Sequence, residues 1–263
     1  MSVAQKGELL ETQEDTHRAV ARVFFTYDGD RVTEIRGLPL HNHLSNVATL
    51  ARHWDFEAAF GSHQCPPELS RTRSWLIEAA RRHDEGKTRQ FSLRQDEQGR
   101  FTYSFRGHRF MVSDDRPYVH WLIRLHHGFS VHDVTEAQAL LKYSDDATFR
   151  AVAHCFPLDL YALEMCDQIE AEAASRAFGQ PDAHRVFMEF EAINFPSREP
   201  TMVRMGLFPY PFAEPEVRIV LESFVVAVPE EVVQDGTSLK HWLLSGGTVV
   251  REEAKEIHLC KME

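Results

Sequence analysis

Cysteine is scarce in this sequence: only four of the 263 residues are cysteines, and no two of them form a C-x-x-C pair. Scattered cysteines are typical of reduced thiols, so the sequence predicts neither a disulfide framework nor a zinc knuckle. Apolar runs of about 18 residues, the length of a membrane helix, are also lacking. The polar start MSVAQKGELLETQED contains no apolar core of a secretory signal. We therefore expect a cytoplasmic protein without a membrane segment.

A basic excess is lacking too, since the formal net charge is −11. A protein that grips a phosphate backbone unaided usually carries an excess of Lys and Arg. The charge is uneven, however, because residues 71–116 contain eleven Lys and Arg residues against seven Asp and Glu residues. This segment is either solvated surface or a track for a nucleic acid that a partner hands over. The 43% hydrophobic and 26% charged residues are otherwise typical of a soluble globular protein.

The first elements that the sequence predicts are a β-hairpin and two helices. Strand-forming residues on both sides of an Asp-Gly turn predict a hairpin over residues 20–35. Apolar residues at helical spacing then predict helices over residues 44–60 and 70–86, with Gly86 as the stop of the second. The polar stretch 88–109 shows little periodicity and is expected to be a loop.

The pattern changes from helices to strands near residue 194, where several prolines interrupt the chain. The sequence therefore predicts a mainly α fold, in which the hairpin begins a helical domain over residues 1–195. Residues 196–263 are expected to form a small β-containing C-terminal appendix, with partner docking as a candidate role. The helices expected in this part of the chain are 117–127, 135–143 and 157–178, and the strands are 217–228 and 249–260.

The strongest chemical signal is the segment A-A-R-R-H-D-E-G-K at residues 79–87. His83 lies on the apolar face of its expected helix, where a histidine is often only a core residue. The adjacent Asp84 changes this interpretation, because a carboxylate can bridge two cations while a neutral imidazole binds one of them. Lys87 follows the glycine that ends the helix, so its ammonium would lie near any phosphate bound at the metals.

Further candidate ligands are spread among the fifteen histidines and the acidic residues. His43 opens an apolar helical segment, and His108 lies in a loop, where a ligand and a solvated histidine look alike. His126 and His127 end a helical run; they either bind one cation together or stabilise the helix C-terminus as a charged surface pair. Asp167 lies on an apolar helix face, where metal coordination would offset the cost of burying its charge, unless its side chain is partly exposed.

The order of these residues resembles the HD nuclease domain of type I CRISPR interference systems, the nuclease half of the helicase–nuclease that degrades target DNA. The H-D-x-G-K motif at His83–Lys87 and the later His-His pair carry the resemblance, which covers about residues 38–180. It implies an HD-domain helical bundle with two divalent metal ions that share one aspartate. The implied ligands are His43, His83, Asp84 and Asp167 for one ion and Asp84, His108, His126 and His127 for the other.

Histidine-rich sites favour manganese, iron, nickel or cobalt over magnesium, which prefers oxygen ligands. One position departs from the family pattern: Arg109 follows His108, where the family usually has an acidic residue. A G-x-x-x-x-G-K-[ST] phosphate loop is absent from the sequence, so the helicase is expected to be a separate polypeptide.

The resemblance implies metal-dependent cleavage of single-stranded DNA, in which a helicase and an effector complex present the strand. Asp84 would bridge the two ions, and Lys87 would help to neutralise charge that develops on the phosphate. The arginines expected to track the strand are Arg81, Arg82, Arg89, Arg106 and Arg109.

Two other functions remain open from the sequence. A nucleotide or cyclic-nucleotide phosphohydrolase would use the same metals, with a closed pocket that selects base and sugar. A catalytically inactive HD scaffold or partner-docking protein would need no metal. Circular single-stranded DNA as a substrate separates the first alternative from a nuclease, and metal analysis tests the second.

Overall fold

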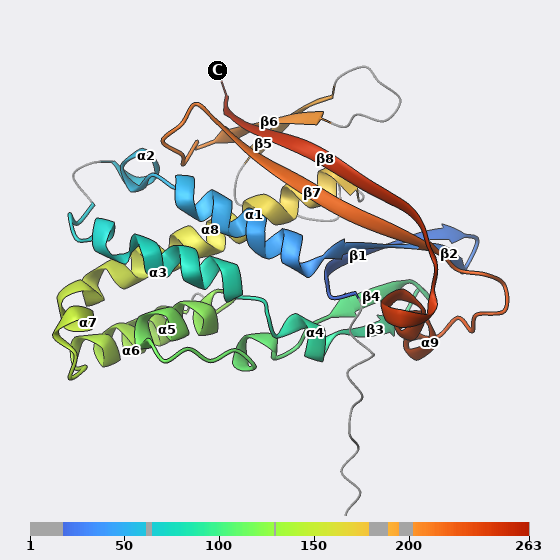
Figure 1. Ribbon diagram of the computed structural model, residues 1–263, viewed down its shortest axis with the longest axis horizontal. Coiled ribbons are helices and arrows are strands. Elements are labelled where there is room, and N and C mark those ends of the chain that lie inside the picture. Colours follow the sequence, from blue (N-terminus) through green and yellow to red (C-terminus); the bar gives the residue numbers. More distant parts are fainter. Residues whose placement is uncertain (1–17, 62–64, 129, 179–188, 195–201, 263) are drawn as a thin grey trace, which may run out of the picture.

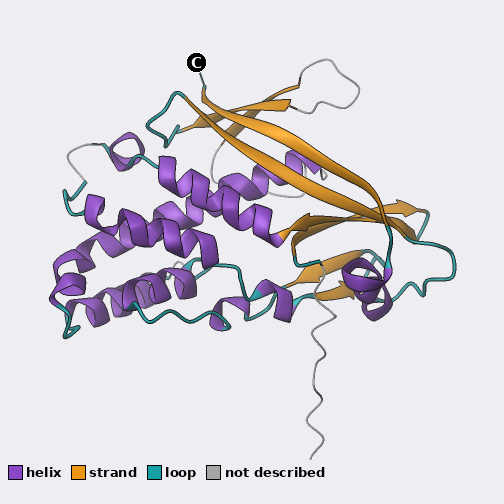
Figure 2. Ribbon diagram, viewed as in Figure 1, coloured by secondary structure: helices purple, strands orange, loops and turns teal. Residues whose placement is uncertain are grey.

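The protein is a mixed α/β structure, in which a group of helices packs beside a long, curled sheet (Figures 1 and 2). The computed structural model describes residues 18–61, 65–128, 130–178, 189–194 and 202–262. Within these ranges, none of the helices combines the length and the apolar character that a bilayer crossing requires.

Six strands form the main sheet, in the order β1-β2-β7-β8-β6-β5. The expected N-terminal hairpin is confirmed: β1 (Val20–Asp28) runs antiparallel to β2 (Arg31–Pro39). Gly29 adopts a positive φ of 58° in the turn between them, a conformation that glycine reaches without strain. The remaining strands are β7 (Glu216–Ala227), β8 (Val249–Lys261), β6 (Met202–Phe208) and β5 (Glu189–Asn194).

The C-terminal strands belong to the main core. β2 of the N-terminal hairpin pairs with β7, and α1 (Leu40–His53) packs against β7. Alternating residues of β7, such as Ile219 and Leu221, share a buried cluster with Leu50 of α1. The expectation of a mainly α fold with a small C-terminal β appendix is therefore wrong, because β-branched runs from both ends of the chain complete one sheet. The expected boundary between residues 195 and 196 lies outside the described residues.

Helix α1 packs against β7 on one side and against α3 and α8 on the other, so it lies between the sheet and other helices (Figure 1). The helix expected over residues 44–60 is interrupted, because the Asp55 carboxylate accepts the backbone N–H groups of Glu57 and Ala58 and begins a separate helix. The helix expected over 70–86 ends earlier, at Arg82, and a turn follows. The bounds of these helices are α2 (Phe56–Phe60), α3 (Leu69–Arg82), α5 (Pro117–Leu125), α6 (Val131–Lys142), α7 (Ala147–Val152) and α8 (Phe156–Phe178).

The segment 88–109, expected to be a loop, is structured instead. It contains the end of the short helix α4 (Lys87–Gln90) and the hairpin of β3 (Ser92–Gln95) and β4 (Phe101–Ser104), and it reaches a 3-10 turn at His108–Phe110. Its aromatic residues pack into a second buried cluster with β1, β2 and α9 (Gly236–His241). The strands are too short for an alternating pattern to be recognised, so only this distant packing reveals them.

Candidate metal centre

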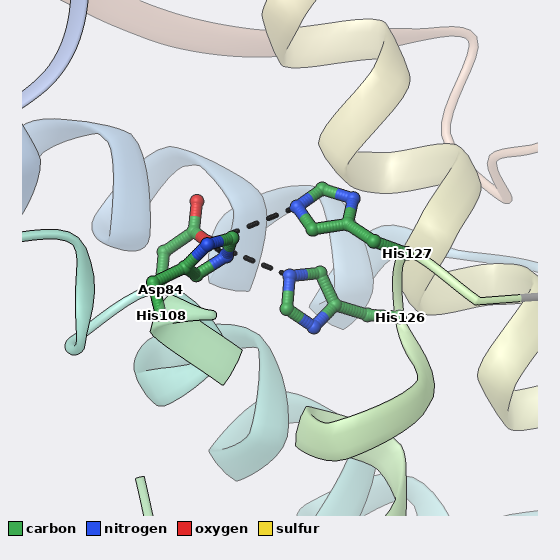
Figure 3. A group of neighbouring side chains, drawn as sticks. All are labelled: Asp84, His108, His126 and His127. Atoms are coloured by element: carbon green, nitrogen blue, oxygen red, sulfur yellow. Dashed lines mark ion pairs between the residues drawn. The ribbon is translucent and has the colours of Figure 1, made fainter. Parts of the chain in front are cut away.

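All seven residues expected to bind metal converge on one site between the helices. They form two groups of possible ligands, and Asp84 belongs to both; within each group the ligand atoms lie within 4.8 Å of one another. Figure 3 shows the group in which the imidazoles of His126 and His127 approach Asp84 and His108. The groups are His43, His83, Asp84 and Asp167, and Asp84, His108, His126 and His127.

The ligands are brought together from five places in the fold. His43 lies in the first turn of α1, and Asp167 lies in the middle of α8. His83 and Asp84 occupy the turn after α3, and His108 begins the 3-10 turn. The His-His pair follows the last residue of α5. The site is thus assembled from helix ends, turns and the middle of α8, which only the tertiary fold brings into contact.

Gly86 allows two of these turns to touch. A Cβ atom at this position would lie 2.1 Å from the backbone carbonyl oxygen of His108, which is far closer than van der Waals contact. The glycine in the H-D-x-G-K motif is therefore needed for close packing, whereas α3 already ends at Arg82. Its absence of a side chain is what lets the turn of Asp84 meet the turn of His108.

Hydrogen bonds fix the orientation of four imidazole rings. In three of them Nδ1 lies against a backbone carbonyl oxygen, which can only accept, so Nδ1 carries the proton. Nε2 of each of these rings then carries a lone pair, which is turned toward Asp84. The partners of Nδ1 are the carbonyl of Ala80 for His83 (2.8 Å), of Phe105 for His108 (2.7 Å) and of Ile123 for His126 (2.6 Å), and the Glu170 carboxylate for His43 (2.7 Å).

The inward-facing atoms at the centre are mostly acceptors, and several lack a donor. Oδ1 of Asp84 lies 2.8 Å from Nε2 of His108 and 3.4 Å from Nε2 of His126, but no hydrogen bond joins them. Oδ1 of Asp167 is also buried without a hydrogen-bond partner. Buried acceptors that face one another are costly unless a cation lies between them. The residues present therefore fit metal ions, and these groups could hold one.

Two cationic side chains balance part of the negative charge. The ammonium group of Lys87 forms an ion pair with Asp84, and Arg22 of β1 lies 3.6 Å from Glu170 and 3.7 Å from Asp167. Burial alone would raise the pKa of Asp84, but Lys87 and the neighbouring imidazoles lower it well below its ordinary value. The pKa of Asp167 is likewise lowered, against the effect of burial, by adjacent imidazoles. Both carboxylates are therefore ionised, as metal ligands must be.

The imidazole of His127 is the most exposed of the seven candidate ligands. Its side chain is 35% exposed, whereas the other six ligands are buried. Burial and the neighbouring His126 lower the pKa of His127 to about 3, so this ring is neutral and free to bind a cation near neutral pH. For His43, burial opposes the charge, but Glu170 and Asp84 raise its pKa to about 9, so metal binding at this ring displaces a proton.

No family model, curated protein or solved structure matches this chain.

The arginines expected to track a strand have different environments. Arg82 is held by an ion pair with Asp114 and by the carbonyl of Ser113, which ties α3 to the segment before α5. Arg109 is partly buried beside the site. The other three, Arg81, Arg89 and Arg106, are exposed.

The sequence did not identify two residues that contribute to the site. Glu170 lies three residues after Asp167 on the same face of α8, and this spacing could have identified it as a partner. Arg22 stands in the apolar strand V-A-R-V-F, where a buried guanidinium is unusual, but the sequence contains no signal for which carboxylate it meets.

Proposed function

We propose that this protein is a metal-dependent phosphodiesterase of the HD type that cleaves single-stranded DNA with two divalent transition-metal ions. The observation that supports the proposal most is the pair of ligand groups that share Asp84. A shared carboxylate holds two cations close together, which is the arrangement used for in-line displacement at phosphorus.

The charge of the site favours an anionic substrate. Three buried carboxylates, those of Asp84, Asp167 and Glu170, face two cationic side chains, those of Lys87 and Arg22. Without metal the charges of these groups nearly cancel. With two divalent ions the same site has a clear positive excess, which a phosphodiester would reduce.

The side chains of the site have different roles in such a reaction. When bound, the ions supply Lewis-acid activation of the phosphodiester and of the attacking water. Asp84 would bind both ions, and the oriented Nε2 atoms of His83, His108 and His126 would be further ligands to them. Lys87, whose ammonium already lies at Asp84, is placed to contact a phosphate oxygen and to neutralise developing charge. His127 lies on the side from which a strand would enter.

The nitrogen-rich ligand set supports manganese, iron, nickel or cobalt as the physiological metal. Five of the seven ligands are imidazoles, whereas magnesium prefers oxygen ligands. The net charge of −11 supports a nuclease that receives its strand from a separate helicase and effector complex. The four cysteines are free thiols, which fits the cytoplasmic location that we propose for this activity.

Circular single-stranded DNA with manganese tests the proposal, because a circle has no ends and must be cut internally. We expect the wild-type protein to linearise the circle and Asp84→Ala to be inactive. Asp145→Ala, which changes an exposed acid at the end of α6, is the matched control and should keep full activity. An intact circle together with hydrolysed mononucleotides or cyclic nucleotides would show a nucleotide phosphohydrolase instead. Failure to retain manganese or cobalt after reconstitution would leave only the inactive scaffold.

A further inference from the structure

A row of aromatic rings and guanidinium groups leads away from the candidate metal centre. Arg109 and Phe110 belong to the turn that carries His108, and Trp121 and Arg124 belong to α5. Cζ of Arg109 lies 5.0 Å from the centre of the Phe110 ring, and Cζ of Arg124 lies 4.7 Å from the same ring. Arg124 also lies 5.9 Å from the Trp121 ring, so the four side chains form one continuous row.

The row begins at the metal centre itself. Arg109 directly follows the ligand His108, and its Nη1 atom lies against Gly128, which directly follows the ligand His127. A Cβ atom on Gly128 would come within 2.7 Å of Nη1, so the glycine leaves the space that this guanidinium occupies. From there the row continues along α5 to Trp121.

The Phe110 ring stays exposed although two guanidinium groups contact it. The Phe110 side chain is 52% exposed, although aromatic rings usually contribute to stability through burial. Neither Arg109 nor Arg124 forms an ion pair in the part of the chain that the structure describes, even though acidic residues outnumber basic ones. Nη1 of Arg109 is buried and has no hydrogen-bond acceptor. This nitrogen therefore lacks the acceptor that a buried donor usually has.

We infer that this row is the binding track for single-stranded DNA, an inference that rests on the proposed nuclease function. Bases of an unpaired strand expose their flat faces and stack on Phe110, Trp121 and the planes of the guanidinium groups. Phosphates of the same strand contact Arg109 and Arg124. The strand then passes Arg109 and reaches the metal centre beside His127. Duplex DNA fits less well, because its bases are already stacked inside the helix.

Binding measured without catalysis tests the track. Fluorescence anisotropy with a labelled oligothymidylate in EDTA reports affinity while no metal is present to cleave the strand. Phe110→Ala should weaken binding roughly tenfold, within the range for loss of one stacked base. Phe110→Trp should restore it. Tyr143→Ala, which removes an exposed aromatic ring at the end of α6, is the matched control and should bind as the wild type does.

The salt dependence distinguishes stacking from charge. Arg124→Ala should reduce the slope of log Kd against log salt concentration by about 0.7, the value for one phosphate contact on a single strand. Phe110→Ala should leave this slope unchanged, because stacking releases no counterions. Arg218→Ala, on the exposed side of β7, removes an equal charge outside the row and should leave the slope unchanged.

Hydrolysis of bis(p-nitrophenyl) phosphate separates the track from the metal chemistry, since this small diester is too short to reach along the row. With manganese, Phe110→Ala should raise the KM for single-stranded DNA more than it raises the KM for the small diester. If Phe110→Ala binds oligothymidylate as tightly as the wild type, or if duplex DNA binds equally well, the track is refuted while the nuclease proposal stands. If Phe110→Ala weakens binding but the wild type hydrolyses neither substrate, the nuclease proposal fails and the binding track stands.

Discussion

Metal binding should stabilise the fold in two separable increments, because two ligand groups share one carboxylate. An ion that binds the folded protein at 100 times its Kd contributes about 2.7 kcal/mol, so two ions contribute about 5 kcal/mol. For a chain of this size each kcal/mol raises Tm by roughly 2–4 °C, which predicts a rise of about 10–20 °C on addition of manganese to the stripped protein.

The rise in Tm of three variants tests whether the two ligand groups share Asp84. His108→Ala removes a ligand from one group only and should lose about half of the rise. Asp84→Asn affects both groups and should lose nearly all of it. His41→Ala is the matched control, since this exposed histidine on α1 pairs with Glu222 at the surface and lies outside both groups.

Differential scanning calorimetry at fixed free manganese, with EDTA as the reference, measures these shifts. The comparison is the difference between the metal-loaded and stripped forms of each variant, so any change in the stability of the stripped protein cancels. An unchanged rise in Asp84→Asn, or equal losses in His108→Ala and Asp84→Asn, would show that the two groups do not share a bridging carboxylate.

Three further predictions concern residues around the centre. Burial raises the pKa of Asp159 to about 6, so ionisation of this carboxyl should lower the free energy of unfolding by roughly 1 kcal/mol as pH rises from 5 to 7. Asp159→Asn keeps the acceptor for the Tyr118 hydroxyl and should lack this slope in urea unfolding at pH 5 and 7, and an unaltered slope would contradict the prediction. Glu170→Gln weakens the hydrogen bond to Nδ1 of His43 and should lower the affinity for manganese 10- to 100-fold, as measured by titration. Wild-type affinity would show that Glu170 does not support His43 as a ligand. Gly86→Ala pushes a methyl group into a backbone carbonyl and should lower the free energy of unfolding by about 1–3 kcal/mol in denaturant unfolding. The variant should also lose bound metal, and full stability would mean that the two turns need not touch.

The site could be predicted from the sequence more completely than the fold. His83 and Asp84 stand out because they form a polar pair at the end of an apolar face of the expected helix. The sheet was missed for a different reason: β2 and β7 pair across almost the whole chain, and such pairing leaves no local signal. The alternating apolar residues of β7 predict a strand, but they do not show which strand pairs with it.

The histidines themselves show which part of a metal site can be encoded locally. His83, His108 and His126 each donate Nδ1–H to the carbonyl three residues before them. His83 and His126 are the residues that end their helices, where backbone carbonyls are no longer all used by the helix. The local turn therefore orients these three rings without help from any other side chain.

His43 lies near the start of its helix, whereas His83 and His126 follow the ends of theirs, and a different kind of partner orients its ring. In the first turn of α1 the carbonyls before His43 accept N–H groups of the helix itself, and Glu170 from α8 supplies the acceptor for Nδ1. This ring depends on a distant residue, which in turn meets Arg22 of β1. The hairpin at the start of the chain is thus linked to the candidate metal centre through the Glu170 carboxylate.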